Sequence, residues 1–222
     1  ITRQEAWAER GDRPLDLVPL VAEVIERVAF EARKDRRIDH RSGVSQRLPI
    51  TVLENVISNA ERRAVQTGEA RITPRIADLY AALPAITGKL ELEYEGELMG
   101  GATIARELIR RAADATLRDR VGPAAMDDVV IWFDAGAALQ VTDEVPTAAL
   151  RAAFDTVPGL SAFVDEVGLA PAGDAAAFAV GCELVLESLV ARRKLSRSES
   201  GRYGAADREP RRRRGSPEDD ER

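Results

Sequence analysis

The chain has 222 residues, of which 45% are hydrophobic, 5% aromatic and 32% charged, and its formal net charge is −6. This negative balance argues against general nucleic-acid binding, which needs an excess of Lys and Arg on one face. Cys182 is the only cysteine and no apolar run reaches about 18 residues, so an internal disulfide and a membrane-spanning helix are both excluded. Because Ala, Leu, Arg and Glu dominate the composition, we expect a mainly helical protein. The single cysteine fits a reducing compartment, so we expect it to be cytoplasmic.

The first part of the chain, residues 14–88, predicts a compact bundle of three helices. The first helix opens at Pro14 and ends at the basic run 33–37, and the second, over about 52–64, is closed by Thr67-Gly68. The third takes Thr73 as its N-cap and Pro74 as its first residue, and Pro84 stops it. The helices share apolar residues at three- and four-residue steps: Leu17, Leu20, Val21, Val24, Ile25, Val28 and Ala32; Val52, Leu53, Val56, Ile57, Ala60 and Ala64; Ile76, Leu79, Tyr80 and Leu83.

Residues 89–195 predict a helical extension that contains at most one or two short strands. Leu90, Leu92 and Tyr94 alternate with glutamates, which fits either a short strand or an extended acidic connector. Helices are expected over about 102–119, after Pro123, from Pro146, after Pro158-Gly159 and from about 171 to 195, and a brief strand or a cap at 141–143. Residues 196–222 have too little apolar surface to offset the entropy of ordering, so we expect a disordered tail.

Several kinds of catalytic site are not expected, because the chain lacks the residues that they need. It has no phosphate-binding loop and no apolar strand ending in paired acids that would hold Mg²⁺. His40 is the only histidine, which argues against a histidine-rich metal site and against a Ser-His-Asp triad. The glutamates at 91, 93 and 95 would share one face of a strand and attract a cation, although a solvated acidic face is the simpler interpretation.

The remaining candidates are two arginines near residue 45. Arg41 and Arg47 flank a short segment that contains Gly43, just before the second helix. A guanidinium group there can bind phosphate oxygens bidentately and stabilise the charge that develops in phosphoryl transfer. The alternative is that both arginines pair on the surface with acids such as Glu26, Glu31 or Glu54.

Several stretches resemble the C-terminal lid of magnesium-chelatase-like and MoxR-type AAA+ ATPases. The resemblance covers about residues 15–135 and is carried by these motifs: Arg36-Arg37-Ile38-Asp39-His40-Arg41-Ser42-Gly43-Val44-Ser45-Gln46-Arg47; Leu53-Glu54-Asn55; Ala60-Glu61-Arg62-Arg63-Ala64; Arg71-Ile72-Thr73-Pro74; and Gly88-Lys89-Leu90-Glu91-Leu92-Glu93-Tyr94-Glu95-Gly96. In that family the lid is a small helical bundle beside the nucleotide, and a sensor-2 arginine at the start of a lid helix contacts the γ-phosphate. By position, the resemblance implies this role for Arg47, with Arg41 as the second candidate.

The resemblance also implies partners and cofactors. ATP and Mg²⁺ would be bound mainly by an AAA+ core upstream of Ile1, and residues 1–13 would connect that core to the lid. The assembled protein would be a homo-oligomeric ring that remodels a partner, such as a protein with a von Willebrand factor A domain, or that inserts a metal ion.

A different class of function stays open beside this one. A helical bundle with a helical extension also suits a non-catalytic protein-interaction or transcription-regulating module. The acidic balance argues against the version of this module that binds DNA.

Overall fold

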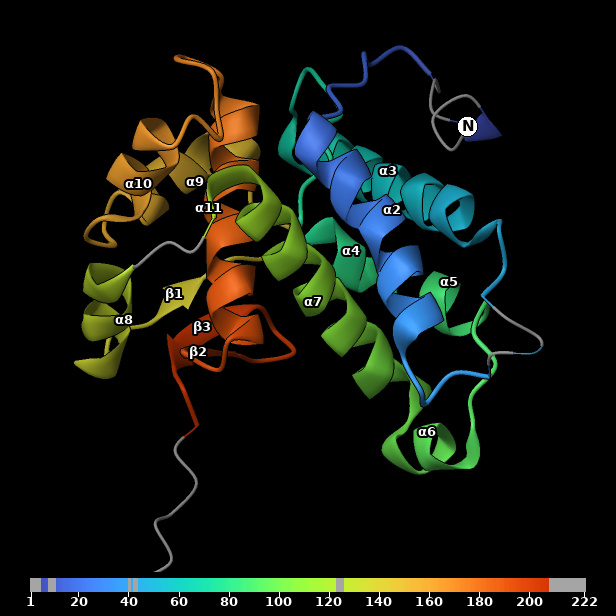
Figure 1. Ribbon diagram of the computed structural model, residues 1–222. Coiled ribbons are helices and arrows are strands. Elements are labelled where there is room, and N and C mark those ends of the chain that lie inside the picture. Colours follow the sequence, from blue (N-terminus) through green and yellow to red (C-terminus); the bar gives the residue numbers. More distant parts are fainter. Residues whose placement is uncertain (1–4, 8–10, 40, 42–43, 123–125, 208–222) are drawn as a thin grey trace, which may run out of the picture.

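The computed structural model describes residues 5–7, 11–39, 41, 44–122 and 126–207, and in this part of the chain it is mainly helical (Figure 1). The all-α fold class is confirmed, with one small sheet added. The elements are α2 (Pro19–Lys34), α3 (Leu48–Thr67), α4 (Asp78–Ala81), α5 (Leu83–Thr87), α6 (Tyr94–Met99), α7 (Gly101–Val121), α8 (Asp127–Asp134), β1 (Leu139–Gln140), α9 (Thr147–Phe154), α10 (Leu160–Glu166), α11 (Ala175–Ala191), β2 (Leu195–Arg197) and β3 (Arg202–Ala205).

Helices α2 and α3 follow the apolar pattern of the sequence, but each begins at a different residue from the one predicted. Helix α2 starts at Pro19 rather than Pro14, because Leu15 forms a parallel bridge with Ile72 and is therefore extended. Helix α3 starts at Leu48, and its proline lies in the first turn, where an amide hydrogen is not needed. Gly68 ends α3 in the left-handed conformation at φ 75°, as the Thr67-Gly68 pair predicts.

The prediction of one continuous third helix between Pro74 and Pro84 was wrong. The chain forms two short helices there, α4 and α5. Thr73 is not an N-cap, because α4 begins only at Asp78 and is preceded by Ala77; the Thr73 carbonyl oxygen instead accepts a hydrogen bond from the Arg63 guanidinium. The carboxylate of Asp78 accepts from the backbone amide of Arg75 at 2.7 Å and thus organises the turn that precedes α4. Pro84 lies in the first turn of α5 and does not end a helix.

Residues 90–95 contain no regular strand. Leu92 makes an isolated antiparallel bridge to Ile38, and α6 begins two residues later. The glutamates at 91, 93 and 95 therefore do not share a strand face, and the less favoured alternative of a cation site on that face loses its geometric basis. The extended connector describes residues 90–93 better than the strand does.

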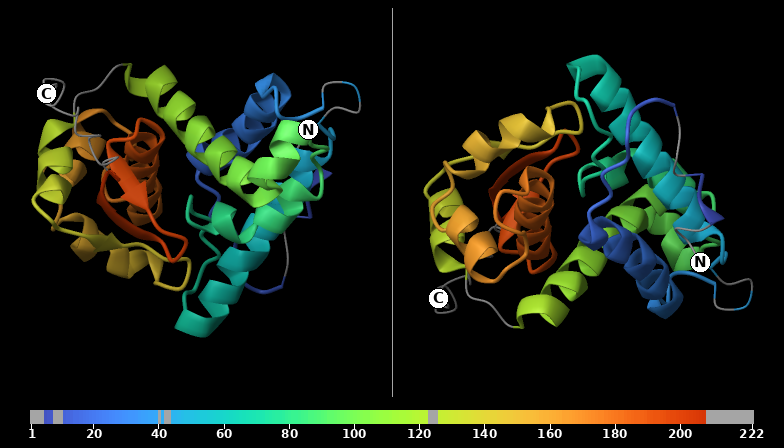
Figure 2. Two further views of the ribbon diagram at one scale, coloured as in Figure 1. Left: turned by 90° about the horizontal axis from the view of Figure 1, so that it is seen from below. Right: turned by 90° about the horizontal axis from the view of Figure 1, so that it is seen from above.

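Two long helices hold the molecule together. Helix α7, predicted at about 102–119, packs along both α2 and α11, so it joins the predicted bundle to the predicted extension. Helix α11 is buried from Ala176 to Val190 and is preceded by Asp174, whose carboxylate caps it by accepting from the Ala177 amide at 2.9 Å. Figure 2 shows α2–α6 in one group of elements and α8–α11 with the strands in the other, with α7 running from one group to the other.

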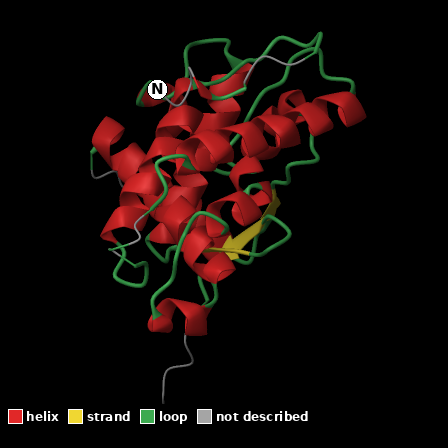
Figure 3. Cartoon of the chain, turned by 90° about the vertical axis from the view of Figure 1, so that its right-hand side faces the viewer, coloured by secondary structure: helices red, strands yellow, loops and turns green. Residues whose placement is uncertain are grey.

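The prediction of a disordered tail was wrong for residues 196–207. Strands β2 and β3 form an antiparallel hairpin, and β1 pairs with the other edge of β3, in the order β1–β3–β2. Figure 3 shows the small extent of the sheet beside the helices. The side chain of Tyr203 is buried, and its ring supplies apolar contact that the polar composition of this segment did not predict. Residues 208–222, which include the basic run 211–214, lie outside the described residues.

The remaining elements are close to their predicted places. The brief strand expected at 141–143 is β1, two residues earlier, and the Val141 amide continues the pairing to the Gly201 carbonyl at 3.0 Å. Pro146 precedes α9 and Gly159 precedes α10, as predicted, while Pro123 lies outside the described residues. None of the described helices combines the length and the apolar character needed to cross a bilayer.

Candidate functional site

Arg47 directly precedes α3 and is exposed to solvent. Its carbonyl oxygen accepts the first hydrogen bond of the helix, from the Thr51 amide at 2.9 Å, and its own amide lies 3.3 Å from the Ser45 hydroxyl oxygen. Leu48 and Pro49 are buried and belong to α3 itself. The arginine is therefore attached to a fixed helix end, and only its side chain extends into solvent.

Arg41 is also exposed, and its backbone amide donates to the carboxylate of Asp39 at 2.6 Å. The segment that carries both arginines is anchored by buried apolar side chains at Ile38, Val44 and Leu48. His40, Ser42 and Gly43 lie outside the described residues, and Val44–Gln46 are the described part of the chain between the two arginines.

Neither guanidinium group forms an ion pair or a side-chain hydrogen bond with another described residue. The acids that were the alternative partners are not paired with these arginines: Glu31 binds Lys34 at 3.1 Å, and Glu54 accepts from the backbone amide of Trp7 at 3.0 Å. Two cationic groups on one anchored segment are thus accessible to an anion from outside the described chain.

A second set of arginines, which the sequence did not single out, is completely buried. Arg63 of α3 donates to the carboxylate of Asp78 at 2.6 Å, and neither side chain has any exposed surface. Asp78 also accepts from the Asn59 amide group at 2.8 Å. The position of Arg63 three residues after Ala60, on the apolar stripe of α3, was the available signal for its burial.

Arg75 extends this network to α11. Its guanidinium donates to the Thr142 carbonyl at 2.9 Å and lies 3.8 Å from the carboxylate of Glu183, which also accepts from the Ala77 amide at 2.8 Å. Burial is the main effect on all three ionisable groups here, because it raises the pKa of Asp78 and of Glu183 and lowers the pKa of Arg75. The network connects α3, α4, α11 and the loop after β1.

A surface hollow of about 450 Å³ lies beside this network, between α4, the loop after β1 and the β2–β3 hairpin. Its floor is formed by Arg197, whose guanidinium carbon is 3.6 Å from the centre of the Tyr80 ring. The carboxylate of Glu187 accepts from the hydroxyl groups of Tyr80 at 2.6 Å and Tyr203 at 2.5 Å and pairs with Arg197 at 3.0 Å. Glu187 does not itself line the hollow, and because it already has three partners it offers no free acid or base there.

Nucleophilic and metal chemistry find little support among the described residues. Burial raises the pKa of the Cys182 thiol, so this cysteine stays protonated inside α11. In the part of the chain that the structure describes, no three His, Cys, Asp or Glu side chains converge as metal ligands would. The chemistry that the described surface supports best is the binding of an anion by Arg47 and Arg41.

Comparisons of the chain with protein-family models, with curated proteins and with solved structures found no match. The resemblance to AAA+ lids therefore stays a prediction, and the case for it rests on the residues and their geometry.

Proposed function

We propose that this chain is the lid portion of a magnesium-chelatase-like AAA+ ATPase, in which Arg47 contacts the γ-phosphate of a nucleotide held by another domain. The observation that carries the proposal is the exposed side chain of Arg47, which has no partner among the described residues and stands at the start of the anchored helix α3. Arg41, on the same anchored segment, is the second candidate.

The position of Arg47 suits this role for electrostatic reasons. Helix α3 has 20 residues, and its N-terminus carries the positive end of the helix dipole. A guanidinium beside that end adds a full charge and two parallel donors for phosphate oxygens. Because the backbone at Arg47 is fixed by the first hydrogen bond of α3, little ordering is needed beyond the side chain itself.

The chain supplies only part of the nucleotide site. It contains no phosphate-binding loop, so ATP and Mg²⁺ would be bound mainly by an AAA+ core. Assembly into a homo-oligomeric ring, and action on a partner such as a von Willebrand factor A domain protein, belong to the same proposal and follow from the resemblance alone.

The test is Arg47→Ala in the protein that contains this chain together with its nucleotide-binding domain. Loss of one transition-state contact should slow ATP hydrolysis by on the order of ten- to a hundredfold while ATP binding is largely kept. Arg33→Ala is a matched control, because Arg33 is an exposed arginine at the C-terminal end of α2, opposite in helix polarity to Arg47. Unchanged turnover in Arg47→Ala would rule out the sensor role, and an equal loss in Arg33→Ala would show that any surface arginine has the same effect.

A further inference from the structure

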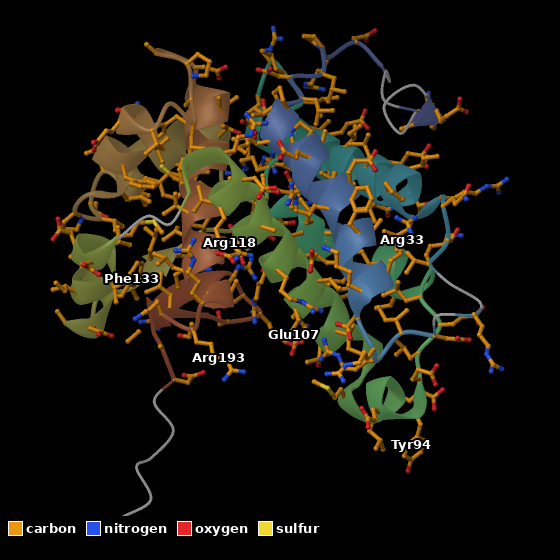
Figure 4. The ribbon with its side chains drawn as sticks, viewed as in Figure 1. Arg33, Tyr94, Glu107, Arg118, Phe133 and Arg193 are labelled. Carbon is orange, nitrogen blue, oxygen red and sulfur yellow. The ribbon has the colours of Figure 1, made fainter. Side chains whose placement is uncertain are left out.

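Helix α6 exposes more apolar surface than a short surface helix of a monomer needs. The side chains of Tyr94, Leu98 and Met99 are 74%, 72% and 44% exposed. Tyr94 and Leu98, four residues apart, are neighbours on one face of the helix, and Met99 follows Leu98 at its C-terminal end. Figure 4 shows Tyr94 at the end of the molecule, directed away from the other helices. These three residues are called the α6 strip below.

The α6 strip is held rigidly by the segment that follows α2. The Glu93 amide donates to the Arg37 carbonyl and the Asp39 amide donates to the Glu91 carbonyl, both at 2.9 Å. Gly96 is buried against that segment so closely that a Cβ atom there would lie 2.4 Å from the Arg37 carbonyl oxygen. An apolar surface fixed in this way binds a partner without a large cost of ordering.

The surroundings of the strip are strongly acidic. Glu91, Glu93, Glu95 and Glu97 are all exposed, and none of their carboxylates forms an ion pair or a side-chain hydrogen bond with a described residue. The neighbouring cation Arg37 is already bound to Asp35 at 2.7 Å and to Glu107 at 2.8 Å. No ion pair between described residues therefore neutralises any of these four carboxylates.

The sign of this charge decides between the kinds of partner. Anionic membrane surfaces and nucleic acids would be repelled by four unpaired glutamates, although the apolar strip alone would suit a lipid surface. A polypeptide segment that carries Lys or Arg around its apolar side chains matches both features at once.

We propose that the α6 strip and its four flanking glutamates form a docking surface for a basic, amphipathic segment of another protein. The apolar side chains of that segment cover Tyr94, Leu98 and Met99, and its cations face Glu91, Glu93, Glu95 and Glu97. The small size of the strip predicts a weak, transient complex. This docking does not depend on nucleotide and stands apart from the role proposed for Arg47.

The test uses a synthetic amphipathic peptide of leucine and lysine, about four helical turns long, titrated into the whole chain labelled with ¹⁵N. We expect saturable shifts of the amide resonances in and around α6, and an affinity that falls as salt is raised. The double variant Tyr94→Ser/Leu98→Ser should bind at least about tenfold more weakly, because it removes the centre of the contact. Replacing the four glutamates by glutamine should weaken binding and flatten its salt dependence.

Matched controls distinguish binding at this surface from non-specific binding of the peptide elsewhere on the protein. Ile131→Ser removes a comparably exposed apolar side chain on α8 and should leave peptide binding unchanged. A leucine-glutamate peptide of the same length and vesicles containing phosphatidylserine should not bind. Shifts that map away from α6, equal binding by the double variant, or vesicle binding that requires Tyr94 and Leu98 would each overturn the proposal.

Discussion

The exposed arginines that precede α3 and the buried arginines of α3 and of the loop before α4 have opposite surroundings. Arg41 and Arg47 are exposed and lack partners among the described residues, whereas Arg63 and Arg75 have no exposed surface and bind Asp78, Glu183 and backbone carbonyls. The same side chain thus serves two purposes. Where its charge is matched inside the protein it joins helices together, and where the charge is unmatched it is accessible to an external anion.

The largest change in stability is expected when a buried arginine is replaced. Arg63→Ala leaves Asp78 buried without its main counter-charge, and we expect the free energy of unfolding to fall by about 3–5 kcal/mol. Urea unfolding followed by circular dichroism measures this loss.

The matched control is the neighbouring residue. Arg62 lies on the same helix, 44% exposed, and pairs with Asp143 at 3.0 Å, so Arg62→Ala should cost about 1 kcal/mol or less. Equal losses in Arg62→Ala and Arg63→Ala would mean that burial does not distinguish the two arginines.

A second prediction concerns Asp35, which is buried where α2 ends. Its hydrogen bonds with Arg37, together with Arg111, hold the pKa of Asp35 well below its ordinary value of 3.8. Asp35→Asn should lower the free energy of unfolding by about 2–3 kcal/mol near neutral pH, because two arginines lose a charged acceptor.

The lowered pKa of Asp35 determines how the stability lost in Asp35→Asn depends on pH. Since the folded-state pKa of Asp35 is lowered, its contribution is complete above the ordinary value of 3.8 and disappears as the pH falls through the folded-state pKa. The difference in stability between the wild type and Asp35→Asn should therefore shrink below about pH 3.8. A difference that stays constant on acidification would contradict the assigned pKa shift.

A smaller effect is expected in the sheet. Tyr203→Phe removes the hydroxyl that donates to Glu187 but leaves the ring in place, so we expect a loss of about 1–2 kcal/mol in thermal or urea unfolding. Tyr94→Phe is the control, because Tyr94 is exposed and no hydrogen bond of its hydroxyl is found within the described residues.

The smallest effect on stability belongs to Arg47. Arg47→Ala should change the free energy of unfolding by no more than about 0.5 kcal/mol, since its side chain is exposed. A loss comparable with that of Arg63→Ala would place Arg47 among the structural arginines and remove the basis of its proposed role.

Local patterns predicted that the long helices exist but not all of their ends, and they predicted the short elements poorly. The last long helix, expected over about 171–195, spans only Ala175–Ala191. The apolar residues of α7 recur at helical spacing, and the observed bounds of α7 differ from those predicted by only one or two residues. The third helix was mispredicted because the Asp78 carboxylate, bound by Arg63 and by the Arg75 amide, redirects the chain there. The region around Tyr203 was mispredicted for a similar reason, since its order comes from Glu187, sixteen residues away.

The candidate site could be predicted in part. The position of Arg47 next to α3 follows from the sequence, but its lack of a partner among the described residues is visible only once the fold separates it from Glu31 and Glu54. The buried network could not be found from charge alone, because Arg62 and Arg63 are adjacent in sequence and differ only in the face of α3 that they occupy.

The two carboxylates of α11 fix the position of that helix relative to its neighbours. Glu183 and Glu187 are four residues apart on a helix that is otherwise almost entirely apolar. Glu183 accepts from the Ala77 amide just before α4, and Glu187 accepts from Tyr80 of α4 and Tyr203 of β3. A purely apolar helix could rotate or slide by a turn among its neighbours at little cost. With these two anions, only one setting of α11 satisfies the Ala77 amide and both tyrosine hydroxyls, so they select a single alignment of the central helix.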